Sequence, residues 1–361
     1  MNESRPYEQV LIERFLDALR ELPDVRVETD VREPFLSAAN KGMVDAEAHL
    51  DIAGKPVVLL VDAKKNVYPR DVRQALWQFN SHRQAYAAGV QHMLVAESLS
   101  QGAKELLKSE RVGYYDTGGS LFLSAPGSYI YIDKPAPKTM EKSVRSLFSG
   151  RRAQVLHALL IYHNEWFGVT RLAEQAQTAP STASEVLREL ERFDWLDSRG
   201  KGPGKERHLR EPGKLLDAWA EQLAGANAPT LRRYYIPGYK SDALIRRIGQ
   251  VFDMQKVAYA LTSEAAAQIY APFLSSISQV RARLLPGSET DAALADLNAR
   301  SVTEGANFAV IDAKSGGELL FREQIDGVWL ASPVQVYLDL LRGEGRAKEQ
   351  AEHLRKERIG F

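Results

Sequence analysis

The residues of this chain best suited to chemistry are two aspartates and a lysine: Asp45, Asp62 and Lys64. The segment that holds them begins at Val44 and reads as two β-strands joined by a tight Gly-Lys-Pro connection. Successive side chains of a strand point to opposite faces, so Asp62 and Lys64 should project from the same face of the second strand. If the two strands pair, Asp45 on the first strand can join them. Two carboxylates beside one ammonium group suit a divalent metal ion and a phosphate, the equipment of phosphodiester chemistry.

The spacing and context of these three residues resemble the PD-(D/E)xK superfamily of restriction endonucleases and Holliday-junction resolvases. Asp45 matches the first motif acid, Asp62 the second acid and Lys64 the motif lysine. The surrounding elements follow the family's order of helix, three strands and helix, and the resemblance covers roughly the first 135 residues. It implies a restriction-endonuclease-like fold in which Asp45 and Asp62 bind Mg²⁺.

Two flanking helices complete the resemblance. The segment Tyr7–Leu22 reads as the helix before the first strand, and Glu13 is its candidate for a further catalytic acid. The helix expected after the motif, Asp71–Ala88, carries Gln74 and Gln78 one turn apart on one face. Related nucleases often place a glutamine at this point, which makes Gln78 the other candidate.

Other interpretations of the motif remain open. A buried strand needs polar residues at its end, and the segment that begins with Asp62 could serve only that purpose. Asp45, Glu47 and Asp51 alternate along one strand, so either of the other two acids could face the metal. Val44 also stands where the family has a proline, and nuclease folds can persist as binding platforms without activity.

The composition limits the remaining classes of function. The chain has 361 residues, enough for two or three domains, and its formal net charge is zero with a pI near 7.1. Binding to DNA must therefore depend on local basic patches. There are no cysteines, which excludes disulfides and thiolate zinc sites and predicts a reducing, cytoplasmic location. No signal pattern and no apolar run of about 18 residues are present, so no membrane partner is expected.

A second domain is predicted for residues 149–226, after a first domain at 1–140 and a linker near Lys134–Ser143. Three helices and then two short strands around a glycine-rich basic tip are expected, with the helices at Arg151–Trp166, Gly168–Gln177 and Ser181–Phe193. This order resembles the winged helix-turn-helix domains of bacterial transcription regulators. The N-terminal half of the third helix would approach base edges, and it offers Ser181, Thr182, Ser184 and Arg188.

The basic tip supplies the expected phosphate contacts. Between residues 199 and 210, five Lys or Arg residues face a single Glu, and glycines between them allow close approach to a backbone. The predicted phosphate-binding residues are Arg199, Lys201, Lys205, Arg207 and Arg210. The alternatives are that the hairpin is merely solvated or that the three helices form a protein-interaction module.

The third predicted domain, 230–361, is mixed α/β. Strands are expected at Val257–Leu261, Val280–Leu284 and Phe308–Ile311, and helices at Ser263–Leu274 and Pro333–Leu341. From about Tyr234 onward, and most in the sequences LASPVQVYLDL and GRAKEQAEHLR, the chain resembles the C-terminal domain of AbiEi-type antitoxins of type IV toxin–antitoxin systems. The resemblance implies a nucleotidyltransferase-like toxin as partner, although those antitoxins begin with the winged helix and lack a nuclease-like domain in front.

The sequence thus predicts an α+β and α/β multidomain protein that binds double-stranded DNA as a transcriptional regulator, with a homodimer on a palindrome as one arrangement. The nuclease-like domain would add a second surface for DNA or a partner. DNA binding would need no cofactor. The alternatives are a Mg²⁺-dependent DNA endonuclease targeted by the winged helix and an antitoxin that binds a toxin.

Overall fold

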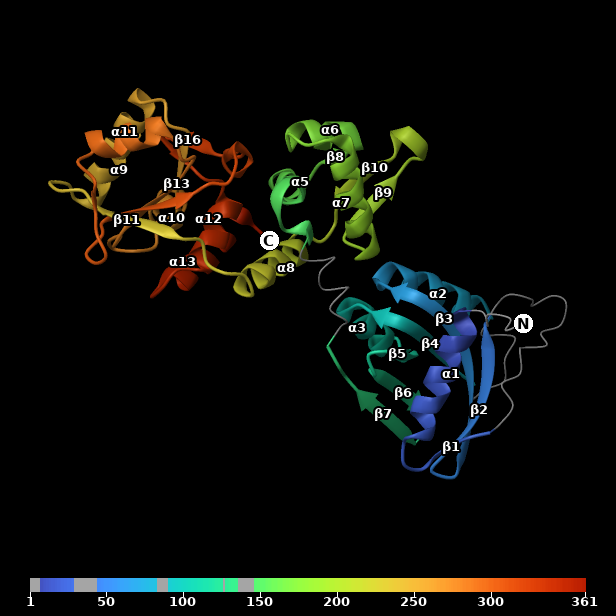
Figure 1. Ribbon diagram of the computed structural model, residues 1–361. Helices are drawn as coiled ribbons and strands as arrows, with labels where there is room; N and C mark the ends of the chain where they lie inside the picture. The colour runs from blue at the N-terminus through green and yellow to red at the C-terminus, as the bar shows by residue number, and fades with distance from the viewer. Residues whose placement is uncertain (1–6, 29–43, 83–89, 126, 136–145) are drawn as a thin grey trace, which may run out of the picture. The chain divides into compact units, whose positions relative to one another are not determined.

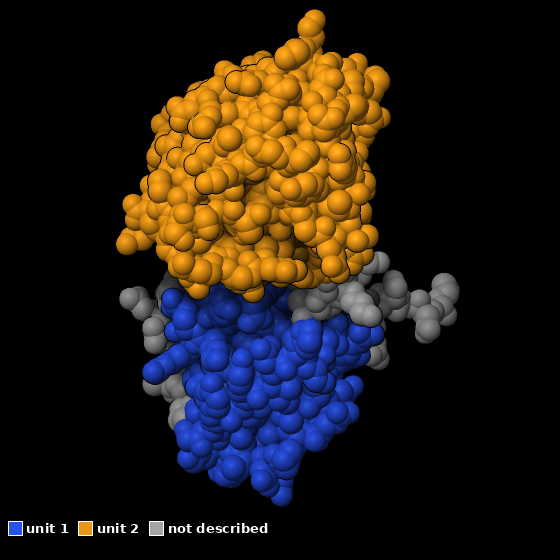
Figure 2. Space-filling view, turned by 90° about the vertical axis from the view of Figure 1, so that its left-hand side faces the viewer, with its two compact units in different colours: residues 1–145, 188–194 blue, residues 146–187, 195–361 orange. Residues whose placement is uncertain are grey.

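The computed structural model describes residues 7–28, 44–82, 90–125, 127–135 and 146–361. The chain forms a mixed α/β protein whose described part contains two seven-stranded sheets and one three-stranded sheet (Figure 1). It divides into two compact units: residues 1–145 with 188–194, and residues 146–187 with 195–361 (Figure 2). The predicted linker near Lys134–Ser143 and the predicted end of the helix at Asp71–Ala88 fall partly outside the described residues.

The first unit contains one sheet whose strands follow the order of the sequence. Pairing is antiparallel from β1 to β3, parallel from β3 to β5 and antiparallel from β5 to β7. The elements are α1 (Tyr7–Arg20), β1 (Val25–Val27), β2 (Ala46–Ile52), β3 (Lys55–Val67), α2 (Pro69–His82), β4 (Val90–Leu99), α3 (Gln101–Ser109), β5 (Gly113–Asp116), β6 (Leu121–Ala125) and β7 (Ser128–Ile132).

Two hydrophobic cores cover the two faces of this sheet. Helix α1 buries Leu11 and Phe15 against Val61 and its neighbours on β2 and β3. Helices α2 and α3 pack on the opposite face, where Val72 contacts the cluster that includes Leu94 of β4. Alternation along β3 therefore divides its side chains between the α1 side and the α2 side.

The connection between β2 and β3 is tighter than the sequence indicated. The turn consists of Ala53 and Gly54, both with positive φ (52° and 80°), and not of Gly-Lys-Pro. Two positive φ values are typical of the two-residue hairpin turn that matches strand twist. The carboxylate of Asp51 accepts a hydrogen bond from Gly54 N at 2.9 Å and stabilises this turn.

The first half of the second unit combines helices with a small sheet of order β8-β10-β9. Its elements are α5 (Gly150–Ile161), β8 (Trp166–Phe167), α6 (Val169–Gln175), α7 (Pro180–Arg192), β9 (Leu196–Arg199), β10 (Glu206–Leu209) and α8 (Pro212–Ala224). The last residues of α7, from Arg188, are grouped with the first unit. Helix α5 ends earlier than predicted because residues 166–167 pair with β10 as an edge strand.

The second half is built on a mixed sheet of order β14-β11-β15-β13-β12-β17-β16. Its elements are β11 (Leu231–Tyr235), α9 (Ser241–Met254), β12 (Tyr259–Thr262), α10 (Ser263–Tyr270), β13 (Val280–Leu284), α11 (Ser288–Asp296), β14 (Arg300–Ser301), β15 (Phe308–Asp312), β16 (Glu323–Ile325), β17 (Val328–Leu330), α12 (Pro333–Leu340) and α13 (Ala347–Leu354).

The two halves of the second unit share contacts that bury polar groups. His157 Nε2 lies 2.5 Å from Ser332 Oγ, and Arg342 donates to the carbonyl oxygen of Leu223 at 2.8 Å. His157 is buried, and this burial lowers its pKa to about 3. Both halves lie in the second compact unit, apart from residues 188–194, which cluster with the first unit. No helix in the described ranges has the length and apolar character needed to cross a membrane.

Candidate functional site

Asp45, Asp62 and Lys64 lie together on the first sheet. In the antiparallel pairing of β2 and β3, Ala46 faces Val61, so Asp45, one residue earlier, faces Asp62. The amide of Asp45 donates to Val61 O at 2.8 Å, and its Oδ2 accepts from Ala63 N at 2.7 Å. Lys64 Nζ lies 2.9 Å from Asp62 Oδ2. The structure thus brings together all three residues of the predicted motif.

Asp45 and Asp62 influence each other's charge. Asp62 Oδ2 is buried and makes no well-formed hydrogen bond in the described part of the chain, but Lys64 neutralises it as an ion pair. Asp45 is exposed as a residue, yet its carboxylate turns inward to the strand. Burial of that group raises the pKa of Asp45, and the nearby Asp62 raises it further through its charge and a hydrogen bond. Ala63 N–H and Lys64 act in the opposite direction.

These features fit a divalent metal ion in part. Asp45 and Asp62 would hold it, because two close carboxylates that share a proton can exchange that proton for a cation. No group of three or more His, Asp or Glu side chains suited to a metal occurs in the described ranges. Mg²⁺ is commonly bound through one or two carboxylates, with water and phosphate oxygens filling the other positions. Asp45 and Asp62 would supply two carboxylate ligands to such an ion.

The two alternative acids of β2 are engaged elsewhere. Glu47 Oε1 lies 2.9 Å from His49 Nε2, and Asp51 stabilises the hairpin turn through Gly54. Asp45 is thus the acid of this strand that meets Asp62.

The flanking helices differ in their relation to the aspartates. Asp62 faces Leu94 in the parallel register of β3 and β4, so it lies on the sheet face that α2 covers. Gln78 is half-buried on α2, on that side. Glu13 is exposed on α1, whose buried side packs on the opposite face of the sheet. The structure therefore does not group Glu13 with Asp45 and Asp62.

The raised pKa of Asp45 predicts proton release on metal binding. At any mildly acidic pH, the raised pKa leaves a larger fraction of Asp45 protonated than of an ordinary aspartate, whose pKa is near 3.9. We expect Mn²⁺ binding to release this proton, and to tighten as the pH rises through the raised pKa. Calorimetric titration in two buffers with different ionisation enthalpies measures the proton count. Asp51→Asn is the matched control, and identical heats in the two buffers would contradict the prediction.

The predicted base-reading residues lie on α7. Ser181 and Arg188 are exposed, whereas Thr182 and Ser184 are half-buried. The helix begins at Pro180, one residue before the predicted start at Ser181. The spacing from residue 181 to 188 places the exposed pair two helical turns apart on one side.

The basic hairpin carries less net positive charge than residues 199–210 alone suggest. Arg199 forms an ion pair with Glu206 at 2.7 Å, and Arg210 forms one with Asp197 at 3.3 Å. Residues 197–211 therefore contain five basic and three acidic side chains, for a net charge of +2. Lys201 is exposed at the tip, and Lys205 and Arg207 are half-buried. Gly200 has a φ of +76°, and a Cβ there would lie 2.8 Å from Gly204 O, so the tight tip requires glycine.

Trp166 is a residue of this hairpin surface that the sequence interpretation placed at the end of a helix. The guanidinium of Arg199 lies over its ring, 4.3 Å from the centroid, and the His208 ring lies 5.3 Å away. This arrangement fixes Arg199 between an aromatic face and Glu206. A signal for it was available, because Trp-Phe immediately before the second helix is typical of a short strand.

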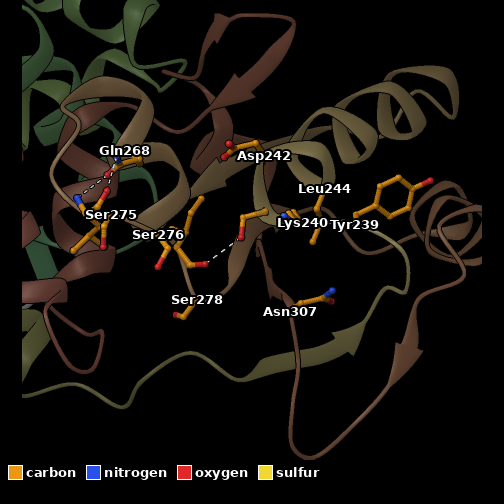
Figure 3. Close-up of a pocket in the computed structure, with 12 residues that line it drawn as sticks. Tyr239, Lys240, Asp242, Leu244, Gln268, Ser275, Ser276, Ser278 and Asn307 are labelled. Carbon is orange, nitrogen blue, oxygen red and sulfur yellow. Dashed lines mark hydrogen bonds between the residues drawn. The ribbon is translucent and has the colours of Figure 1, made fainter.

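A cavity of about 460 Å³ lies at the end of the large sheet of the second unit, beside the start of α9 (Figure 3). Two polar residues of its lining are engaged in structural contacts. Gln268 bonds the backbone of Phe273 and Leu274, and Asn307 bonds both backbone groups of Ile236 at 2.8 and 2.7 Å.

Comparison with known proteins found no match among protein families, curated proteins or solved structures. The resemblances to PD-(D/E)xK nucleases and AbiEi-type antitoxins remain predictions from the sequence.

Proposed function

We propose that this protein binds double-stranded DNA as a transcriptional regulator, through a winged helix formed by residues 149–226. The observation that carries the proposal is the arrangement of α5, β8, α6, α7 and the β9–β10 hairpin, with β10 between β8 and β9. A winged helix has the same element order, and it places its third helix in the major groove. Helix α7 is that third helix.

The side chains on these elements suit a division of labour on DNA. Ser181 and Arg188 on α7 have the exposure needed to reach base edges. The exposed Lys201, with Lys205 and Arg207 on the same hairpin, supplies cations for the phosphate backbone. Arg199 and Arg210 are paired with Glu206 and Asp197 in the unbound protein.

The test is the triple variant Lys201→Ala/Lys205→Ala/Arg207→Ala in fluorescence anisotropy with duplex DNA over a series of salt concentrations. Losing three phosphate contacts should weaken binding about tenfold or more and reduce the slope of log K against log salt by about 2.7. A control variant, Arg246→Ala/Lys256→Asn/Lys348→Ala, removes the same charge from exposed positions outside the hairpin. Asparagine suits position 256 because its φ is +57°. If the two variants had equal slopes of log K against log salt, the hairpin would not be part of the DNA interface.

A second candidate function, a metal-dependent DNA endonuclease, is favoured by the convergence of Asp45, Asp62 and Lys64. A divalent ion at this site would polarise the scissile phosphate. Asp45 and Asp62 would hold that ion on the sheet face that α2 covers. Lys64 Nζ, once released from Asp62, could donate to a phosphate oxygen and stabilise the charge that develops there.

Nicking of supercoiled plasmid in the presence of Mg²⁺ or Mn²⁺ tests this second candidate. We expect Asp62→Asn and Lys64→Met each to reduce the nicking rate by about 100-fold or more, because one removes a metal ligand and the other a phosphate donor. Asp51→Asn, on the same hairpin but engaged in the turn, should retain the wild-type rate. Folded wild-type protein that cleaves no form of DNA would reduce this domain to a binding platform.

A further inference from the structure

The large sheet of the second unit is covered unevenly by helices. On one face, Phe252 of α9 packs against Phe308 of β15. On the other face, α10 and α12 pack against β12 and β13, in the middle of the sheet. The strands at the opposite end, β11 and β14, are exposed on this second face, as the accessibility of Arg233 and Tyr235 shows.

The register collects three arginines and a tyrosine on that face. Ala309 of β15 is paired with Arg233 of β11 on one side and with Arg281 of β13 on the other. Paired residues share a face, so both guanidiniums flank Ala309 on the side away from Phe308. Tyr235 lies two residues after Arg233 and is paired with Arg300 of β14. We call this group, Arg233, Tyr235, Arg281 and Arg300, the arginine patch.

The arginine patch differs from the other arginines of the same sheet. Arg232, which faces the α9 side, is bound to Asp312 at 2.6 Å. Arg283 is bound to Asp339 and Glu318. In the described ranges, Arg233 and Arg300 are exposed and have no carboxylate within salt-bridge distance, and Arg281 donates to Gln279 at 2.9 Å.

The acid on the adjoining helix does not neutralise the patch. Glu264 of α10 accepts hydrogen bonds from Ser278, at 3.3 Å from its amide and 3.1 Å from its hydroxyl. Tyr235 is 43% exposed, which leaves its ring and hydroxyl accessible between the guanidiniums. The result is a compact surface of positive charge with an aromatic group, on a molecule whose net charge is zero.

We infer that the arginine patch is a second binding surface for the phosphate backbone of duplex DNA, separate from the hairpin. The inference rests on the proposed function. Guanidinium groups bind phosphate oxygens in a bidentate manner, and a tyrosine hydroxyl can donate to a neighbouring phosphate. The contacts are to the backbone, so this surface adds affinity that does not depend on sequence.

The experiment compares Arg233→Ala/Arg300→Ala with Arg246→Ala/Lys256→Asn, which removes two charges on and just after α9, the helix that packs on the opposite face. Each pair is made in the wild-type chain and in the hairpin triple variant, and anisotropy is measured with duplex DNA over a salt series. We expect the patch variant to reduce the slope of log K against log salt by about 1.8, for two phosphates, in both backgrounds. The control pair should leave the slope unchanged.

The outcomes separate this inference from the proposed function. Suppose that the wild type binds duplex DNA, that the hairpin variant binds it more weakly, and that the patch variant has the same salt slope as its control. Only the inference about the arginine patch is then overturned. If the wild type binds no duplex DNA, both proposals fail. Circular dichroism of each variant confirms that the four exposed substitutions leave the fold intact.

Discussion

Replacing Asp339 with alanine should lower the free energy of unfolding by about 3–5 kcal/mol, because it leaves Arg283 charged and buried without its principal partner. The Arg283 side chain is 11% exposed and that of Asp339 is 5% exposed. Two parallel hydrogen bonds join them, from Nε to Oδ2 at 2.8 Å and from Nη2 to Oδ1 at 2.5 Å. Thr262 and Gln335 donate to the same carboxylate at 2.5 and 3.0 Å.

Urea unfolding followed by circular dichroism measures this loss. The double variant Arg283→Met/Asp339→Leu removes both charges and keeps most of the side-chain volume, so it should recover most of the lost stability. Gln335→Ala removes only one outer hydrogen bond and should cost about 1 kcal/mol. An Asp339→Ala variant as stable as Gln335→Ala would show that the pair is not buried in solution.

Replacing Lys104, in the first unit, with alanine should lower the free energy of unfolding by a similar amount, about 3–5 kcal/mol. The Lys104 side chain is 3% exposed and that of Asp116 is 1% exposed, and Nζ lies 3.1 Å from Asp116 Oδ2. The same ammonium donates to Ser120 Oγ at 2.6 Å and to Lys134 O at 2.9 Å. Its removal would leave a buried carboxylate and two acceptors without their donor.

A matched pair of variants separates charge from packing at this site. Lys104→Met retains the length of the side chain but leaves Asp116 buried, so it should remain strongly destabilised. Lys104→Met/Asp116→Asn removes both charges and should be considerably more stable than the single variant. Chemical unfolding curves for the three proteins test this order, which would be wrong if the double variant were the least stable.

Much of the local structure was predictable because its signals are local. Alternation with a period of two placed Asp62 and Lys64 on one strand face, and the positions of both residues on β3 agree with it. The buried strands carry strong hydrophobic patterns, so β13 has the predicted limits. Helix α9 was not predicted, and neither were the short strands β8, β14 and β16, which exist because a neighbouring strand pairs with them.

Only the tertiary structure decided which faces and charges meet. The sequence placed Glu13 on a helix, but which side of the sheet that helix covers depends on packing against residues far along the chain. Likewise, the sequence alone did not show that Asp197 neutralises Arg210 of the hairpin. That pairing follows from the strand register. The arginine patch arises in the same way, because Arg233, Arg281 and Arg300 are separated in sequence and adjacent only in the sheet. Sequence fixes the period of a strand or helix through local geometry, whereas long-range pairing selects the neighbours of each side chain.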